Sequence, residues 1–240
     1  MPIALVANAS ASGLVNATTA GINTTGANLL VLGISCDDAF ADTPSDSKGN
    51  TWTQLTSYSN AQPRVRLWYS VPSSVGTSHT FSSNGVALVG SIFAAAFSGV
   101  SATPTDQQNG ANGTGSATLA TGSITPSENN ELLISVLAFN AAGSNCTNGS
   151  SFTETNEIDF GAGDHYGGVL AYIVQTTAGA VNLTWTRGTG TSGMAATIAS
   201  FKASASGPAN LKTYNTTTKA NTKTINTNAI ANVKTVNTNA

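Results

Sequence analysis

The chain contains very little charge. Of its 240 residues only 8% are Asp, Glu, Lys or Arg, whereas soluble domains carry about a quarter. Nine basic residues stand against eleven acidic ones, which gives a formal net charge of −2. So few basic residues cannot form an extensive phosphate-neutralising face, and nucleic acid is therefore not an expected partner. Low charge combined with many Val, Ile and Leu residues is also the opposite of the disordered signature.

Long apolar runs are also missing. No stretch of eighteen apolar residues occurs, so no membrane-spanning helix and no membrane insertion are expected. The first residues carry no Lys or Arg ahead of their short apolar stretch, so no secretory signal peptide is expected either. A surface-like composition without an export signal favours a virion component that is assembled inside a cell and released by lysis.

Residues that could carry out acid–base or thiol chemistry are scarce. There are two histidines: His79 falls in an expected strand and is predicted to face solvent, and His165 lies in a Gly-rich loop. His165 is a candidate ligand-binding residue, with an ordinary loop position as the alternative. Cys36 and Cys146 could form one disulfide, and the sequence leaves this open. No nucleophile-elbow, zinc-protease, P-loop or dinucleotide motif occurs, so no catalytic residues and no cofactor are predicted.

The carboxylates form two clusters, in residues 37–46 and 154–164. Oxygen ligands within one loop could bind Ca²⁺, and paired carboxylates across a groove could cleave a glycosidic bond. Neither cluster follows a recognised ligand spacing. Three interpretations therefore remain open: calcium binding, glycosidic cleavage, and loop charges that are simply solvated. The weak calcium candidates are Asp37, Asp38, Asp42 and Asp46.

Small polar residues are abundant. Thr, Ser and Asn number 35, 27 and 24, and Gly, Asn, Ser and Pro clusters separate short apolar segments. Short apolar segments separated by turn-forming clusters predict an all-β fold of the β-sandwich or jelly-roll-like kind. The expected strands are 27–35, 51–56, 64–71, 79–82, 86–97, 116–120, 132–139, 168–174, 181–186 and 195–201.

An internal repeat indicates duplication. Residues 29–34 match residues 132–137 at an offset of 103, and Tyr69 falls on Tyr172 at the same offset. We therefore expect a first β-sandwich unit at 1–103 and a second at 104–206, either fused into one sandwich or in tandem. Residues 207–240 are expected to be a linker and a repeat tail.

The tail repeats every eleven residues from 211 to 240, with Lys at 212, 223 and 234. Because it holds four Lys and no acid, the tail carries +4 and the body −6. Its apolar spacing would suit a supercoiled helix, but Thr and Asn are poor helix formers, so an extended or β conformation is favoured. A segment this polar needs an outside partner, most simply copies of itself. The residues predicted to mediate oligomerisation or anchoring are Leu211, Tyr214, Ile225, Ile230, Val233 and Val236.

One expected strand combines basic and aromatic residues. Alternation places Arg64, Arg66 and Trp68 on one face and apolar residues on the other. If exposed, this face could stack a sugar ring or dock a partner, whereas a Trp that simply covers the sandwich edge is the alternative.

The runs 27–35, 49–53, 65–72 and 94–100 resemble a low-charge β-sandwich module common in phage structural proteins and bacterial surface proteins. The motif Lys-Thr-Ile/Val-Asn-Thr-Asn-Ala is similar to short C-terminal repeats of phage fibre and virion proteins, which often have Asn-Gly in place of Asn-Thr. That departure weakens the prediction of a tight two-residue turn. The resemblance implies an assembly or attachment role and supplies no catalytic residues.

The sequence therefore predicts a non-enzymatic structural protein on a virion surface, either a phage capsid decoration protein or a short fibre. Its expected partners are copies of itself, with a trimer as the expected state, and capsid or other virion proteins. One alternative is a carbohydrate-binding adhesin module that recognises a cell-surface glycan. The other is an extracellular filament subunit whose tail adds to a neighbour as a strand. For both alternatives the expected location is extracellular or on the cell surface.

Overall fold

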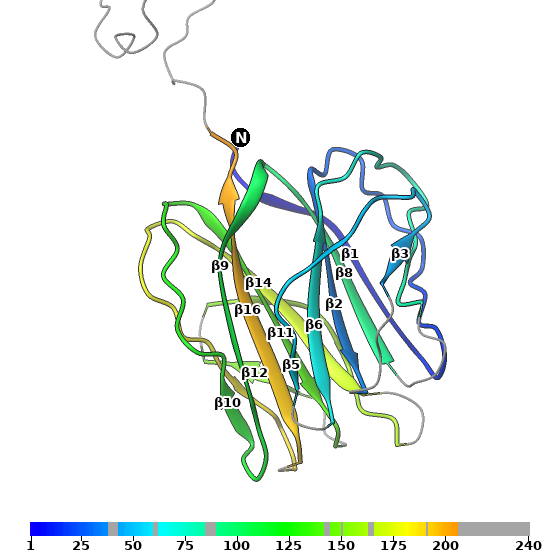
Figure 1. The fold of residues 1–240 in the computed structure, drawn as a ribbon, viewed down its shortest axis with the longest axis vertical. Helices are drawn as coiled ribbons and strands as arrows, with labels where there is room; N and C mark the ends of the chain where they lie inside the picture. The colour runs from blue at the N-terminus through cyan, green and yellow to red at the C-terminus, as the bar shows by residue number, and fades with distance from the viewer. Residues whose placement is uncertain are drawn as a thin grey trace, which may run out of the picture. The chain divides into compact units, whose positions relative to one another are not determined.

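The computed structural model describes residues 1–37, 43–59, 62–84, 90–141, 145–149, 151–162, 166–190 and 192–205. Throughout these ranges the chain forms strands, turns and loops without any helix, which confirms the predicted all-β class. Residues 1–205 form one compact unit (Figure 1).

The first half of the chain forms an antiparallel sheet in the order β1-β8-β2-β6-β4, with β5 also paired to β6. Its strands are β1 (Ala4–Gly13), β2 (Leu29–Cys36), β4 (Thr53–Gln54), β5 (Tyr58–Ser59), β6 (Arg64–Ser70) and β8 (Gly90–Ser98).

The second half forms a sheet in the order β13-β14-β11-β16-β9. Its strands are β9 (Val100–Gly113), β11 (Glu131–Phe139), β13 (Thr153–Ile158), β14 (Gly167–Gln175) and β16 (Met194–Ala203). The two sheets have the same strand order. In this correspondence β9 is equivalent to β1, β16 to β8, β11 to β2, β14 to β6 and β13 to β4.

The two sheets pack face to face, and each also carries a cap on its outer side (Figure 1). The cap of the first sheet contains β3 (Ser45–Asp46) and β7 (Phe81–Ser82), which pair with each other. The cap of the second sheet contains β10 (Thr118–Ala120), β12 (Thr147–Asn148) and β15 (Thr184–Thr186). Three buried apolar clusters result, one between the sheets and one under each cap.

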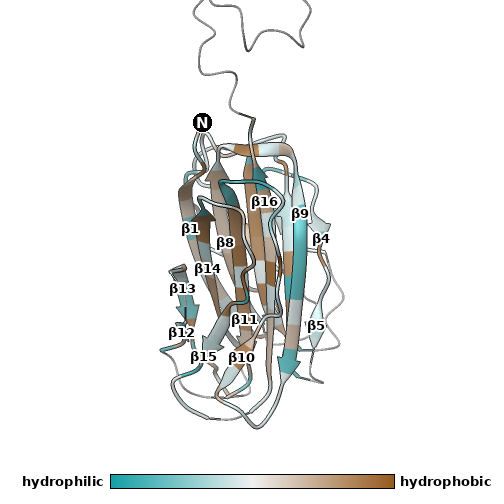
Figure 2. Ribbon diagram, turned by 90° about the vertical axis from the view of Figure 1, so that its left-hand side faces the viewer, coloured by the Kyte–Doolittle hydropathy of each residue, from teal (hydrophilic) through white to brown (hydrophobic). Residues whose placement is uncertain are grey.

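Burial on both faces explains the continuous apolar runs of the central strands. In β2, Leu29 and Val31 face the opposite sheet, while Leu30 and Leu32 face the cap. A strand covered on one side only would alternate with polar residues. Figure 2 shows this contrast, because β8, β11, β14 and β16 are largely brown while much of the edge strand β9 is teal.

The duplication is visible in the strand registers. Leu29 pairs with Phe97 in the first half, and Leu132 pairs with Phe201 in the second. The capping bridge between Ile22 and His79 has its counterpart between Ile124 and Val181. Each half thus supplies one sheet and one cap, and the two halves together make a single sandwich.

The chain passes from one sheet to the other through Gly99, which has a φ of 77°. A side chain here would be strained and would collide with the backbone of Pro2. Glycine therefore allows β8 to end at Ser98 and β9 to begin at Val100 with a single residue between them.

Candidate functional site

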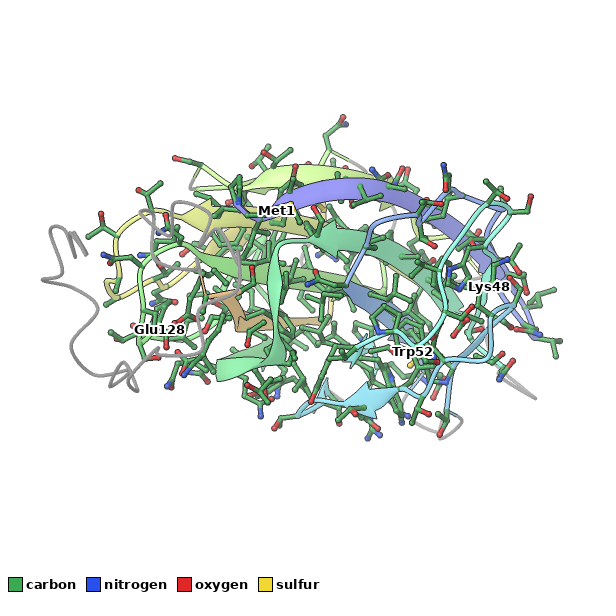
Figure 3. The ribbon with its side chains drawn as sticks, turned by 90° about the horizontal axis from the view of Figure 1, so that it is seen from above. Met1, Lys48, Trp52 and Glu128 are labelled. Atoms are coloured by element: carbon green, nitrogen blue, oxygen red, sulfur yellow. The ribbon has the colours of Figure 1, made fainter. Side chains whose placement is uncertain are left out.

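Asp46 is the centre of a buried hydrogen-bond network in the first cap. Its carboxylate accepts hydrogen bonds from the backbone N–H of Lys48 (2.8 Å) and of Asn50 (3.2 Å) and from Nδ2 of Asn50 (3.0 Å). Nε1 of Trp52 (2.9 Å) and Nε2 of His79 (2.8 Å) donate two more. Figure 3 shows Lys48 and Trp52 on the loops beside the first sheet. A buried carboxylate needs several donors, and these five join separate loops into one cap.

His79 uses both ring nitrogens inside the protein. Its Nδ1 lies 2.9 Å from Oγ1 of Thr24, and its ring stacks on Phe81 with centroids 4.3 Å apart. The order hydroxyl, imidazole, carboxylate has the connectivity of a nucleophile, base and acid. However, Thr24 and His79 are both 0% exposed, so no substrate reaches the hydroxyl in this conformation. The prediction that His79 faces solvent is wrong, because residues 71–80 fold over the sheet.

Asn50 connects the Asp46 network to the next loop. Its Oδ1 accepts hydrogen bonds from the backbone N–H groups of Ser73 (2.9 Å) and Ser74 (3.0 Å), and its Nδ2 donates to the carbonyl of Ser74 (2.9 Å). Sequence reasoning missed Thr24 and Asn50 as network residues. For Asn50 a weak signal existed, because it lies in a short Gly-containing segment between Asp46 and Trp52.

The Arg64, Arg66 and Trp68 face exists, but it is not an exposed platform. The three residues share the outer side of β6, while Val65 and Leu67 face the opposite sheet. Arg66 is 4% exposed and Trp68 5%, because the cap covers them. The exposure that the sugar-stacking interpretation required is therefore not found at Arg66 and Trp68. Trp52 and Trp185 are buried as well.

The acidic loop candidates do not converge on a metal site in the described residues. Asp46 is saturated by N–H donors, and Asp37 accepts hydrogen bonds from Nε2 of Gln62 (2.7 Å) and the hydroxyl of Tyr166 (3.4 Å). Burial, with Asp37 nearby, raises the pKa of Tyr166 to about 12. Within the described ranges no group of three or more His, Cys, Asp or Glu could hold a metal ion. Asp38, Asp42 and His165 lie outside those ranges.

The two cysteines form no disulfide and are buried under different caps. Cys36 packs in the first cap and Cys146 in the second, so they are not bridged. Burial raises the pKa of the Cys146 thiol, and the nearby carboxylates of Glu157 and Glu154 raise it further. Neither thiol therefore has the exposed, electropositive surroundings of a reactive cysteine.

An open groove lies between the edge of the first sheet at β4 and the edge of the second sheet at β9. Its volume is about 430 Å³, within the range of ligand sites. It is lined by Thr51, Thr53, Tyr69, Val71, Ala102, Thr103, Pro104 and Thr105. Hydroxyl groups, one aromatic ring and a few apolar surfaces therefore share one concave site.

The groove exists because the two edges diverge at one end only. Further along, Gly110 of β9 touches the ring of Tyr58, and the backbone N–H of Thr56 donates to Oε1 of Gln108 (2.8 Å). These contacts close the sandwich edge there. Towards the start of β9 the ladder to β16 is interrupted, since Thr105 pairs with Phe201 but Val100 pairs with Ala203. Residues 101–104 therefore bulge out of the sheet and form one wall.

The tail residues predicted to mediate oligomerisation, from Leu211 to Val236, lie outside the described residues. No family model, no curated protein and no solved structure matches the chain. Among the described residues, no helix has the length and apolar character needed to cross a membrane.

Proposed function

We propose that this chain is a non-enzymatic structural protein of a virion surface, a capsid decoration protein or a short fibre, that assembles through its repeat tail. The observation that carries the proposal is that Asp46, His79 and Thr24 bond to one another in the interior, away from any substrate. These groups, which could have done acid–base chemistry, instead hold the loops of a cap together. The described body is thus a low-charge building block with one apolar core between its sheets and one under each cap.

The tail supplies the assembly element in this proposal. Its 11-residue repeat places apolar residues such as Ile225, Ile230 and Val233 among Thr and Asn, too few to bury a core alone. A tail of +4 and a body of −6 attract one another, which favours association between copies. Copies of the chain, expected as a trimer, and capsid proteins are the proposed partners.

A filament subunit is the second candidate, and the groove between β4 and β9 favours it. A groove at a sheet edge can receive an extended segment of a neighbouring molecule. The carbohydrate-binding alternative has less support, because the Trp68 face, one of the two places proposed for a glycan, is covered.

Light scattering of the full chain tests the proposal. We expect a trimer or larger assembly, and we expect Ile225→Asp combined with Val236→Asp to reduce it to the monomer. As a control, Thr217→Asp adds charge at a polar tail position and should leave the mass unchanged. A full chain that stays monomeric at every concentration, alone and mixed with purified capsids, would contradict the proposed function.

A further inference from the structure

We propose that the groove between β4 and β9 binds an extended segment of the tail, residues 222–236, from a neighbouring copy of the chain. This inference rests on the proposed function and names the receiving surface for the tail. The groove lies between the edges of the two sheets, with Thr51 and Thr53 in one wall and residues 102–105 in the other.

The lining fits a Thr- and Asn-rich strand with scattered apolar residues. Thr51, Thr53, Thr103 and Thr105 present hydroxyl groups, which both donate and accept hydrogen bonds. The ring of Tyr69 lies edge-on to Phe201 with centroids 5.9 Å apart, so it is held in place at the groove. Thr and Asn side chains of residues 222–236 match such groups.

The groove also offers apolar contact. Val71 is 45% exposed, one of four large apolar side chains exposed in the described part of the chain, and the exposed Ala102 lies in the opposite wall. A β-branched residue of the tail, such as Ile225 or Val233, would cover Val71. A volume of about 430 Å³ accommodates only a few residues, so only a short stretch within residues 222–236 occupies the groove.

The described part of the chain ends close to one end of the groove. Ala203 pairs with Val100, and the backbone N–H of Ser204 donates to the carbonyl of Gly99 (2.8 Å), so their partners lie two and three positions before the wall residue Ala102. β16 runs antiparallel to β9 towards this end. Seventeen residues separate Ser204 from Thr222, which is enough chain to reach the groove of an adjacent copy. Two adjacent copies can therefore exchange tails reciprocally.

Charge favours the same arrangement. Asp106 directly follows the wall residue Thr105, and the carboxylates of Asp106 and Glu128 both approach Nζ of Lys202 at 3.6 Å. One lysine shared between two carboxylates leaves net negative charge for the lysines of an incoming tail. Hydrogen bonds donated by Ser127 and the charge of Lys202 outweigh burial and lower the pKa of Asp106, so its carboxylate stays ionised at neutral pH.

Cysteine crosslinking in the full chain tests the inference. Two differently tagged variants, Thr103→Cys and Asn226→Cys, are mixed and oxidised, and the native cysteines are buried and contribute little background. We expect a covalent dimer that joins the two tags. The control pair, Thr125→Cys with Asn226→Cys, places the thiol on the cap of the second sheet and should give at least tenfold less product.

Three results would overturn the inference. A crosslink that forms only within a single chain carrying both substitutions would show that each tail occupies its own groove. No crosslink in an assembly that light scattering shows to be oligomeric would reject the groove while the proposed function stands. Saturable binding of an oligosaccharide that Thr103→Arg abolishes, without any tail crosslink, would make the groove a glycan site. A purely monomeric chain would instead contradict the proposed function itself.

Discussion

Gly33 of β2 and Val136 of β11 face one another across the centre of the sandwich. A Cβ placed on Gly33 would lie only 2.7 Å from Cγ2 of Val136. The two residues are equivalent in the duplicated halves, since Gly33 pairs with Leu67 where Val136 pairs with Leu170. The local two-fold axis therefore passes between them, and a small residue in one half makes room for the larger residue in the other.

Exchanging this pair tests the packing. Gly33→Val should lower the free energy of unfolding by about 1–3 kcal/mol or more, because two valines cannot share the site. Val136→Gly should also be destabilising because it leaves a cavity. The double variant swaps the residues across the axis, and urea unfolding should show it to be more stable than the sum of the two losses implies. Strict additivity would show that the two positions are independent.

Removing the imidazole of His79 should destabilise the first cap. His79→Ala takes one donor from the buried carboxylate of Asp46 and one partner from Thr24, and we expect a loss of about 2–4 kcal/mol. Thr80→Ala, at the neighbouring half-exposed position, should change the unfolding free energy by less than about 0.5 kcal/mol. If chemical denaturation shows an equally small loss of unfolding free energy for both variants, the network does not stabilise the cap.

Glu131 makes stability depend on pH. Burial raises its pKa, and the carboxylate of Asp106 raises it further despite hydrogen bonds from Ser200 and from the backbone of Glu128. Ionisation of Glu131 therefore weakens the folded state, with no penalty below the unfolded pKa and a full penalty above the folded pKa. Glu131→Gln should raise the melting temperature at pH 7 and have a smaller effect near pH 4.

Glu128→Gln is the control for that experiment, because its carboxylate is 55% exposed in the same loop. Glu128→Gln should change the melting temperature very little at either pH. If Glu131→Gln raises the melting temperature by the same amount at both pH values, packing of the amide, and not titration of Glu131, is responsible.

The native thiols should resist modification. Cys36 and Cys146 are 0% and 3% exposed, and burial raises the pKa of Cys146, so little thiolate is available at pH 8. Mass spectrometry should find the folded chain unmodified by iodoacetamide over the period in which the urea-unfolded chain takes up two labels. Rapid labelling of Cys146 alone would reveal local opening of the second cap.

The central strands could be predicted from the sequence and the edge strands could not. β2, β11 and β16 are apolar on both faces, so their runs stand out in a polar chain. β1 and β9 were missed, because an edge strand covered on one side only can have the composition of a loop. The polar segment from Asp106 to Gly113 is ordered by its ladder to β16, which no local signal reveals.

The candidate site was less predictable. The alternation in β6 assigned Arg66 and Trp68 to one face correctly, but whether a cap covers that face depends on residues far away in the sequence. The contact between Thr24 and His79 joins positions 55 apart, and the groove needs two edges from different halves. Spacing along one strand contains none of this information.

The two ends of the body differ: the chain enters and leaves at the end where Gly99 lies, and the turns after β1 and β9 lie at the other end. The carbonyl of Gly99 accepts the hydrogen bond of Ser204, and Pro2 lies against its α-carbon, so both termini of the body leave from the same end (Figure 1). β1 ends at Gly13 and β9 at Gly113, both at the other end, where Leu14 is 53% exposed. Any anchor at either terminus therefore presents these turns outward, and a peptide epitope inserted after Gly115 would be displayed at the tip farthest from the attachment point.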